Sequence, residues 1–329
     1  MKKILLIGTG GTIASDVTED GLAPELTTEQ LLSHLPAISG ICDVDCVQLL
    51  NLDSTNMRPE HWLKMVRCIR ENYGRYDGFV ITHGTDTMAY TASAVTFMLP
   101  NISVPVVFTG SQLPLTELLS DGPANLRTAF AMAASETPGV FLAFDRKVML
   151  GCRAVKVRAS GFSAFESINA HYAATVSTQG LRVDREVVPK ALGPAELKDS
   201  LCREVFLLKL TPGLNPAVFD MLAAMGYKGI VIEAFGLGGV NVLHKGLRGI
   251  RRAVEDGVSV VVTTQCLYDS ADLGVYQVGK KLLELGVIQG KDMTSEAAYT
   301  KLMWGLGQGL TPQGIAELFE RDLAGEITG

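Results

Sequence analysis

The sequence predicts an α/β protein, with a larger N-terminal domain built on a doubly wound, mostly parallel sheet and a smaller α/β C-terminal domain. Two observations predict this class. Apolar strand-like segments alternate with helix-like segments from the first residues onward, which indicates right-handed crossovers between parallel strands. The strand-like segments are also continuous runs of Val, Ile and Leu, which is typical of strands buried on both faces of a sheet.

The expected N-terminal elements follow from these runs and from helix-start signals. Thr27 or Thr28 is placed to cap the first helix, and Pro59 falls in the first turn of the second. The apolar runs predict strands at 3–7, 44–50, 78–82, 104–109 and 140–144. The segments between them predict helices at 28–35, 59–71, 87–99 and 123–135.

A change of character near residue 184 marks the expected domain boundary. The segment 184–203 contains Pro189, Gly193 and Pro194, carries more charge and shows little strand pattern, so we assign it to a connection. The N-terminal domain is then 1–183 and the C-terminal domain 204–329, and a chain of 329 residues is long enough for both. The second domain is expected to contain strands at 205–210, 229–233 and 258–263, and helices at 215–225, 245–255, 295–306 and 311–321.

Composition narrows the class of function. The formal net charge of −6 argues against a nucleic-acid partner, which requires a basic surface. The longest apolar runs are strand-sized, so no membrane span is expected, and the run after Lys2 and Lys3 is too short for the core of a secretory signal. The six cysteines show no Cys-x-x-Cys spacing. We therefore expect a cytoplasmic protein with free thiols and no metal or other cofactor.

The candidate chemistry lies just after the strands, where ligands bind in open parallel sheets. Four successive strand ends supply glycines, hydroxyls and a carboxylate. The segments are Gly8-Thr9-Gly10-Gly11-Thr12, Asp53-Ser54-Thr55-Asn56, His83-Gly84-Thr85-Asp86-Thr87 and Gly110-Ser111-Gln112. Any one of them is most simply turn chemistry or a helix cap. Their convergence on one edge of the sheet is the informative feature.

A dinucleotide fingerprint is the rival interpretation of the first segment, and it fails on spacing. Ile13 stands where the third glycine should be, and the next strand does not end until Asp53, about twice the expected distance to the acidic residue. Hydroxyls, one carboxylate and outward-facing N–H groups suit a zwitterionic amino acid or a developing oxyanion instead. A general base is less obvious. His83 is expected to be structural, and a buried lysine such as Lys156 could serve in its place.

These motifs resemble the two signature segments of the bacterial-type asparaginase/glutaminase family. The signature-like segments are Thr9-Gly10-Gly11-Thr12-Ile13 and His83-Gly84-Thr85-Asp86-Thr87. The likeness continues through Asp53-Ser54, Gly110-Ser111, the stretch 120–126, the stretch 153–158 with Lys156, and segments near 292–294 and 300–302. It covers essentially the whole chain, and the start of the chain resembles the type I, cytosolic branch.

The resemblance implies a mechanism and a set of site residues. Thr12 would attack the side-chain amide of L-asparagine, form an acyl-enzyme and release ammonia, and water would then release aspartate. Thr85, Asp86 and Lys156 would form a hydrogen-bonded set that positions or activates a hydroxyl or water. Asp86 would also hold the α-ammonium group. The substrate-binding positions would be Asp53, Ser54, Thr55, Gly84 and Ser111, with Ser54 on the α-carboxylate and Ser111 on the amide.

One departure from the family pattern concerns the loop after the first strand. Family members carry a tyrosine there that is thought to activate the nucleophile, whereas this chain has Leu22 and no tyrosine before Tyr73. Another group activates Thr12, or the enzyme is slow, or its preferred substrate differs. The loop from Ala14 to Leu26 is expected to be a mobile lid because it offers few apolar anchors.

Other interpretations remain open. The asparaginase-like component of the tRNA-dependent amidotransferase would carry an extra domain before its nucleophile, and a lysophospholipase-type relative would add C-terminal repeats. A non-catalytic amino-acid sensor is a third interpretation. The resemblance also implies a homodimer or homotetramer whose second domain completes another chain's site, through Gly238-Gly239-Val240-Asn241 and Tyr268-Asp269-Ser270-Ala271-Asp272.

Overall fold

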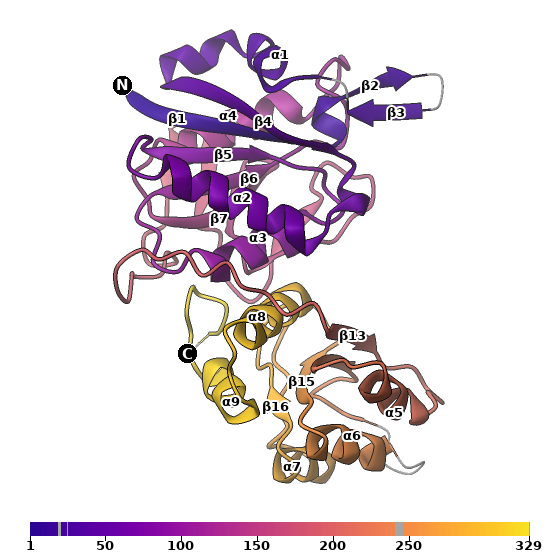
Figure 1. The fold of residues 1–329 in the computed structure, drawn as a ribbon. Coiled ribbons are helices and arrows are strands. Elements are labelled where there is room, and N and C mark those ends of the chain that lie inside the picture. The colour runs from indigo at the N-terminus through magenta and orange to yellow at the C-terminus, as the bar shows by residue number, and fades with distance from the viewer. Residues whose placement is uncertain (19–20, 25, 241–245, 329) are drawn as a thin grey trace. The chain divides into compact units, whose positions relative to one another are not determined.

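The computed structural model describes residues 1–18, 21–24, 26–240 and 246–328, with the backbone alone for 16–18 and 21–24. The chain divides into two compact units, Met1–Asp199 and Ser200–Gly329. The division falls inside the segment 184–203 that the sequence assigns to a connection. Each unit has its own sheet (Figure 1).

The N-terminal unit is built on an eight-stranded sheet with the order β12-β11-β8-β7-β6-β5-β1-β4. The five strands from β7 to β4 are parallel to one another, and the pairs β7–β8, β8–β11 and β11–β12 are antiparallel. The parallel strands are β1 (Lys2–Gly10), β4 (Cys42–Leu52), β5 (Gly78–Thr82), β6 (Pro105–Thr109) and β7 (Gly139–Phe144). The antiparallel strands are β8 (Lys147–Leu150), β11 (Ala174–Ser177) and β12 (Gly180–Val183).

The helices of this unit flank the sheet (Figure 1). They are α1 (Thr28–Ser33), α2 (Pro59–Asn72), α3 (Met88–Met98) and α4 (Gly122–Ala133), with short 3-10 turns η1 (Thr12–Ala14), η2 (Pro36–Gly40) and η3 (Ser54–Asn56). Thr27 caps α1, as one of the two expected capping residues, by accepting a hydrogen bond from the Gln30 N–H. Pro59 occupies the first turn of α2, where its missing N–H is harmless.

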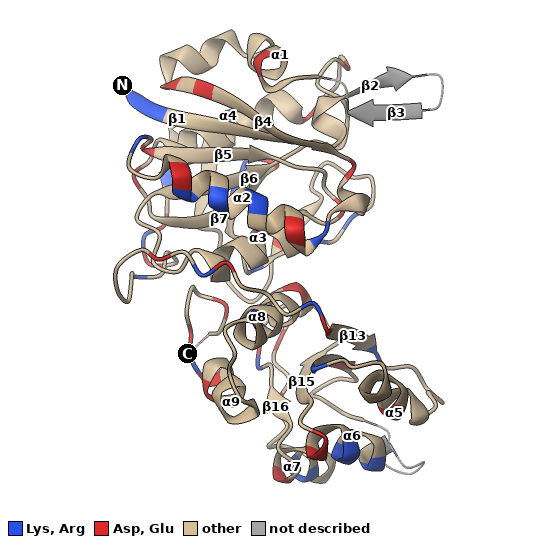
Figure 2. Cartoon of the chain, viewed as in Figure 1, with Lys and Arg blue, Asp and Glu red and all other residues tan. Residues whose placement is uncertain are grey.

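The core of the sheet explains why the strand predictions succeed. Every residue of β5 and β6 is buried, and neither strand carries a charged side chain (Figure 2). Each fully buried Val, Ile or Phe contributes about 1.5–3 kcal/mol relative to exposure, so these runs are stable only inside a two-faced sheet. The observed architecture confirms the predicted α/β class.

Two short hairpins lie outside the large sheet. One joins β9 (Ala154–Lys156) to β10 (Phe165–Ser167), and the other joins β2 (Ser15–Thr18) to β3 (Gly21–Pro24). The second hairpin occupies the segment that the composition predicts to be an irregular loop. In it the backbone of Leu22 pairs with that of Val17, while the side chain of Leu22 lies outside the described residues. The proposed lid motion of this segment stays a prediction.

The C-terminal unit contains a parallel four-stranded sheet of order β13-β14-β15-β16. Its strands are β13 (Val205–Lys209), β14 (Gly229–Ala234), β15 (Ser259–Thr264) and β16 (Ile288–Gln289). Its helices are α5 (Ala217–Ala224), α6 (Gly246–Glu255), α7 (Gln277–Glu284), α8 (Ser295–Gly307) and α9 (Pro312–Glu320). The sequence does not predict α7 and β16, because their apolar runs are too short to show a period. Among the described residues, no helix has the length and apolar character needed to cross a membrane.

Candidate active site

The four predicted strand ends meet through close backbone approaches. A side chain at Gly11 would bring a Cβ to 2.3 Å from the Gly84 nitrogen, and one at Gly84 would meet the Ser54 hydroxyl at 2.6 Å. A Cβ at Gly110 would lie 2.3 Å from the His83 carbonyl oxygen. Only glycine fits such contacts. The segments after β1, β4, β5 and β6 are therefore joined at one edge of the sheet, as the sequence predicts.

Thr12 stands at the start of η1, directly after the Gly11 that packs on Gly84. Gly11 has a φ of +84°, which turns the chain sharply out of β1. Its carbonyl accepts hydrogen bonds from the Ala14 N–H and from the Ser15 hydroxyl, each at 3.0 Å. Thr12 is half-buried, so it keeps some access to solvent.

A lysine brings together the acidic and hydroxyl groups of the third strand end. Lys156, the last residue of β9, donates from Nζ to Thr85 Oγ1 at 2.9 Å and to Asp86 Oδ1 at 2.5 Å. These contacts confirm the prediction that Lys156 lies within hydrogen-bond reach of Thr85 or Asp86. Thr85 is buried, the Lys156 side chain is 16% exposed and the Asp86 side chain is 57% exposed. The carboxylate therefore remains open to a ligand while the lysine is mostly enclosed.

The Asp53-Ser54-Thr55 turn contributes one enclosed hydroxyl. Ser54 is buried beside Gly84, and its carbonyl accepts a hydrogen bond from the Thr87 hydroxyl at 2.8 Å. Asp53 and Thr55 are exposed and bond to each other, because Asp53 Oδ1 accepts from the Thr55 N–H at 2.8 Å and from its hydroxyl at 2.9 Å. Asp53 thus caps the η3 turn that holds Ser54 in place.

The fourth strand end presents Ser111 and a neighbour that the site prediction does not include. Ser111 is buried and its hydroxyl donates to the Leu113 carbonyl. Gln112 Oε1 accepts from Thr85 Oγ1 at 3.1 Å, which makes this glutamine a direct neighbour of the Thr85–Lys156 pair. The sequence feature that could have identified Gln112 is its position directly after a strand that ends beside the signature segment. A glutamine does not titrate, so its residue type alone gives no reason to single it out.

His83 has a structural environment, as expected. It is fully buried, its Nδ1 bonds the Gly84 carbonyl at 2.7 Å, and its Nε2 lies 2.9 Å from Thr91 Oγ1. The indole N–H of Trp62 donates to the same threonine oxygen at 2.9 Å. Burial lowers the pKa of His83 to about 4, so the imidazole is neutral. Through its bond to the Gly84 carbonyl it stabilises the signature turn.

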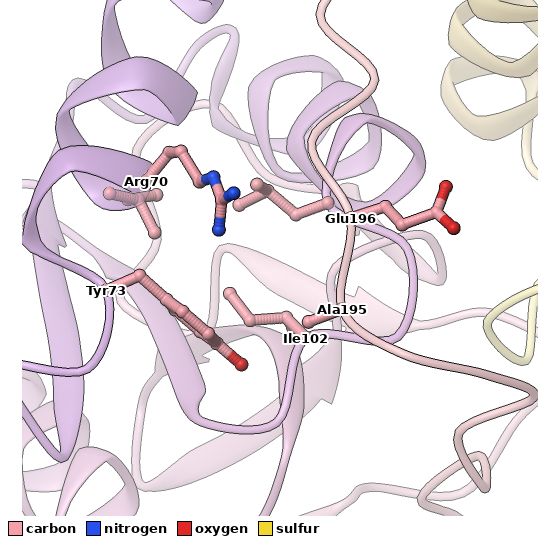
Figure 3. A pocket seen from close by; sticks show the side chains of 7 residues that line it. Arg70, Tyr73, Ile102, Ala195 and Glu196 are labelled. Atoms are coloured by element: carbon pink, nitrogen blue, oxygen red, sulfur yellow. The ribbon is translucent and has the colours of Figure 1, made fainter.

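Two surface hollows lie elsewhere. One is a small apolar notch of about 10 Å³, lined by Ile69, Arg70, Tyr73, Leu99, Ile102, Ala195 and Glu196 (Figure 3). That volume is scarcely enough for one water molecule. The other, between α5 and α6, measures about 460 Å³. The described residues that line them include none of the predicted site residues. No group of His, Cys, Asp and Glu among the described residues is arranged to hold a metal ion.

The joined strand ends of this α/β fold are the candidate site, and comparison with known families identifies the class of protein. Residues 3–189 match the N-terminal domain of asparaginase, and residues 204–319 match the glutaminase/asparaginase C-terminal domain. The chain belongs to the asparaginase family.

Particular relatives are similar over nearly the whole chain. The L-asparaginase of Thermococcus kodakarensis is 44% identical, with 99% of each chain covered, and its solved structure superposes with a TM-score of 0.92. L-asparaginase I of Vibrio cholerae is 35% identical, with a TM-score of 0.90 and 99% of each chain covered. A glutamyl-tRNA(Gln) amidotransferase component from Pyrococcus abyssi is 38% identical, with 100% of this chain and 77% of that protein covered.

Proposed function

We propose that this chain is an L-asparaginase, which hydrolyses L-asparagine to L-aspartate and ammonia through a threonine acyl-enzyme, with a side activity on glutamine. The observation that carries the proposal is the hydrogen-bonded set of Lys156, Thr85 and Asp86 at the strand ends that also hold Thr12. A hydroxyl is a weak nucleophile at its ordinary pKa and needs such an adjacent group. The 44% identity to an L-asparaginase supports the same substrate.

We assign each site residue a task in this reaction. Thr12 attacks the side-chain amide carbon and ammonia leaves, after which water hydrolyses the ester. Asp86, with its exposed carboxylate, takes the α-ammonium group of the substrate. Ser54 and nearby N–H groups take the α-carboxylate, with Gly84 leaving room for them, and Ser111 orients the amide. Asp53 and Thr55 support this by fixing the turn around Ser54.

The decisive experiment measures ammonia release from asparagine by the purified chain and by a Thr12→Ala variant. The variant should keep the wild-type melting temperature and lose at least about two orders of magnitude in kcat, because the covalent step is gone. Thr12→Ser is the matched control and should retain measurable turnover. Wild-type activity in the alanine variant would refute the nucleophile assignment.

The leucine at position 22, where the family carries a tyrosine, leads to a separate prediction about turnover. Leu22 has no hydroxyl to relay a proton, so activation of Thr12 falls to the Lys156 set or to a tyrosine elsewhere, such as Tyr268, which is 49% exposed. Leu22→Tyr should raise turnover of asparagine if the relay can be restored. No change in Leu22→Tyr, together with a neutral Tyr268→Phe, would show that neither tyrosine limits the reaction.

A second function is favoured by the likeness to the amidotransferase component. In that case the chain would be an amidase that acts as part of a larger enzyme. An amino-acid sensor, by contrast, would bind the substrate without turning it over, and ammonia release from asparagine by the isolated chain separates the proposed function from the sensor.

We further infer that the protein is cytoplasmic and assembles as a homodimer or homotetramer. The residues expected to complete a second chain's site are Gly238 to Val240 and Tyr268 to Asp272, while Asn241 lies outside the described residues. Sedimentation and activity should be measured together across a dilution series. A fully active monomer at nanomolar concentration would contradict the assembly proposal.

A further inference from the structure

Gln112 is held at both ends by hydrogen bonds to parts of the chain that are distant in sequence. Its side-chain Nε2 donates to the carbonyl oxygens of Ala159 and Gly161, each at 3.1 Å. Its backbone N–H donates to both carboxylate oxygens of Asp121, at 3.0 and 3.1 Å. Its Oε1 is 3.1 Å from Thr85 Oγ1. One glutamine thus joins the signature turn to the segment that follows β9.

These partners determine which way the amide of Gln112 faces. Carbonyl oxygens only accept hydrogen bonds, so the NH₂ group must point toward Ala159 and Gly161. The amide oxygen is then left facing Thr85. Because that oxygen only accepts, the Thr85 hydroxyl must donate its single hydrogen to Gln112.

The direction of this hydrogen bond determines which hydrogen-bonding positions of the Thr85 hydroxyl remain free. A hydroxyl oxygen has one hydrogen and two lone pairs. The hydrogen goes to Gln112, and Lys156 Nζ donates to one lone pair at 2.9 Å. What Thr85 can offer to a third group is therefore its second lone pair. A water or hydroxyl that approaches it meets a hydrogen-bond acceptor.

We propose that Gln112 is a positioning residue that fixes the direction of the Thr85 hydrogen bond, so that Thr85 accepts from the attacking hydroxyl or water. The proposal rests on the proposed function and assigns a role within that site. Without the Gln112 oxygen, the Thr85 hydroxyl can rotate among its staggered positions and present its hydrogen to the reacting group. A hydrogen in that place opposes the attacking O–H instead of orienting it.

The surroundings of Gln112 are built to keep it still. Asp121, which binds the Gln112 N–H, also accepts from the Leu113 N–H at 3.2 Å and from the Asn125 amide at 3.0 Å. Asn125 in turn donates to the Gly110 carbonyl at 2.9 Å. The backbone around Gln112 is therefore anchored to the start of α4.

The test compares Gln112→Met, which keeps the length and removes both amide functions, with Gln308→Met as the matched control. Gln308 also donates to a backbone carbonyl, that of Ser200 at 2.9 Å, and belongs to the C-terminal unit. We expect kcat of Gln112→Met to fall about 10- to 100-fold, as for a misplaced catalytic group, with a much smaller change in KM. The control should keep the wild-type kcat.

Gln112→Glu supplies a readout that loss of packing alone would not move. An ionised carboxylate places an oxygen against the two carbonyls of Ala159 and Gly161, whereas the protonated acid donates to them and reproduces the amide pattern. The ratio of its kcat to that of wild type should therefore rise at least about threefold as pH falls from about 8 toward about 5, nearer the usual glutamate pKa. If Gln112→Met does not fold, this ratio decides alone.

The outcomes separate the two proposals. An active wild type with Gln112→Met within about threefold of its kcat, or a Gln112→Glu ratio that does not change with pH, overturns the role of Gln112 only. A wild type that releases no ammonia from asparagine overturns the proposed function itself.

Discussion

Each unit of the molecule contains a lysine–carboxylate pair at the same 2.5 Å separation, and the two pairs differ in their access to water. Lys156 and Asp86 in the N-terminal unit have side chains 16% and 57% exposed. Lys301 and Glu326 in the C-terminal unit are both 0% exposed. The chemistry of the groups is the same, so the difference in surroundings decides what each pair can do.

The buried pair is fully committed to structure. Lys301, in α8, also donates to the Arg321 carbonyl at 2.8 Å, and Glu326 accepts from the N–H groups of Leu323 and Ala324. Burial by itself would raise the pKa of Glu326, but the charge and hydrogen bonds of Lys301 outweigh it and lower the pKa. The pair ties the C-terminal segment to α8, and because both side chains are fully buried it is not accessible to a ligand.

The open pair shows the converse. Lys156 is fixed by two hydrogen bonds, while more than half of the Asp86 side chain is exposed. An acidic group held on one side and open on the other can exchange water for the ammonium group of a substrate. Exposure weakens this salt bridge as a source of stability, and in the proposed function it also gives the substrate access to Asp86.

The largest expected effect is on activity, at the open pair. Lys156→Met should reduce kcat by about 10²- to 10⁴-fold, because the group that bonds Thr85 is lost, while asparagine binding partly survives through Asp86 and Ser54. The melting temperature should change little, since a partly exposed pair adds little stability. Steady-state kinetics and calorimetric titration check both points. Near-normal turnover would show that this pair is as structural as the buried one.

The next effect is on stability, at the buried pair. Glu326→Gln should destabilise the chain by about 3–5 kcal/mol in denaturant unfolding, because it leaves the Lys301 charge buried and unpaired. Glu320→Gln is the matched control. It removes the partner of Lys291 from a pair in which Glu320 is 66% exposed, and should cost at most about 1 kcal/mol. Equal losses in the two variants would show that burial does not set the strength of these pairs.

The same variant has a defined pH dependence. The pKa of Glu326 is lowered in the folded chain, so its stabilising contribution is present above the unfolded pKa of about 4.3 and is lost as pH falls through the folded value. The gap between wild type and Glu326→Gln should therefore narrow below about pH 4.

A third buried group, the His83 imidazole, tests the comparison further through the pH dependence of stability. Burial lowers its pKa, as the charge of Lys301 does for Glu326. The folded pKa of His83 is about 4, against about 6.5 unfolded, so the unfolded chain binds the extra proton between these values. Stability should decline by about 3 kcal/mol as pH falls from 6.5 to 4. His83→Gln should remove this slope from the stability–pH curve. An unchanged slope would mean that other groups produce it.

Much of the fold could be predicted because burial on two faces leaves a plain trace in the sequence. The runs that form β5 and β6 are apolar throughout, and their ends match the predicted residues closely. The sequence does not predict the antiparallel strands β11 and β12 or the hairpin of β2 and β3. They are only four residues each, and β11 and β12 alternate between more and less exposed positions, which gives too few repeats to detect.

The candidate site also has one part that the sequence predicts and another that only the tertiary structure defines. The sequence determined which residue types follow each strand, and the parallel order of the strands is enough to place Thr12, Ser54, Thr85 and Ser111 at one edge. Only the tertiary structure decided which side chains meet. Lys156 and Thr85 are 71 residues apart, and Gln112 reaches Thr85 across 27. Hydrogen bonds depend on ångström distances and on the direction of each donor, and the spacing of residues along a chain specifies neither.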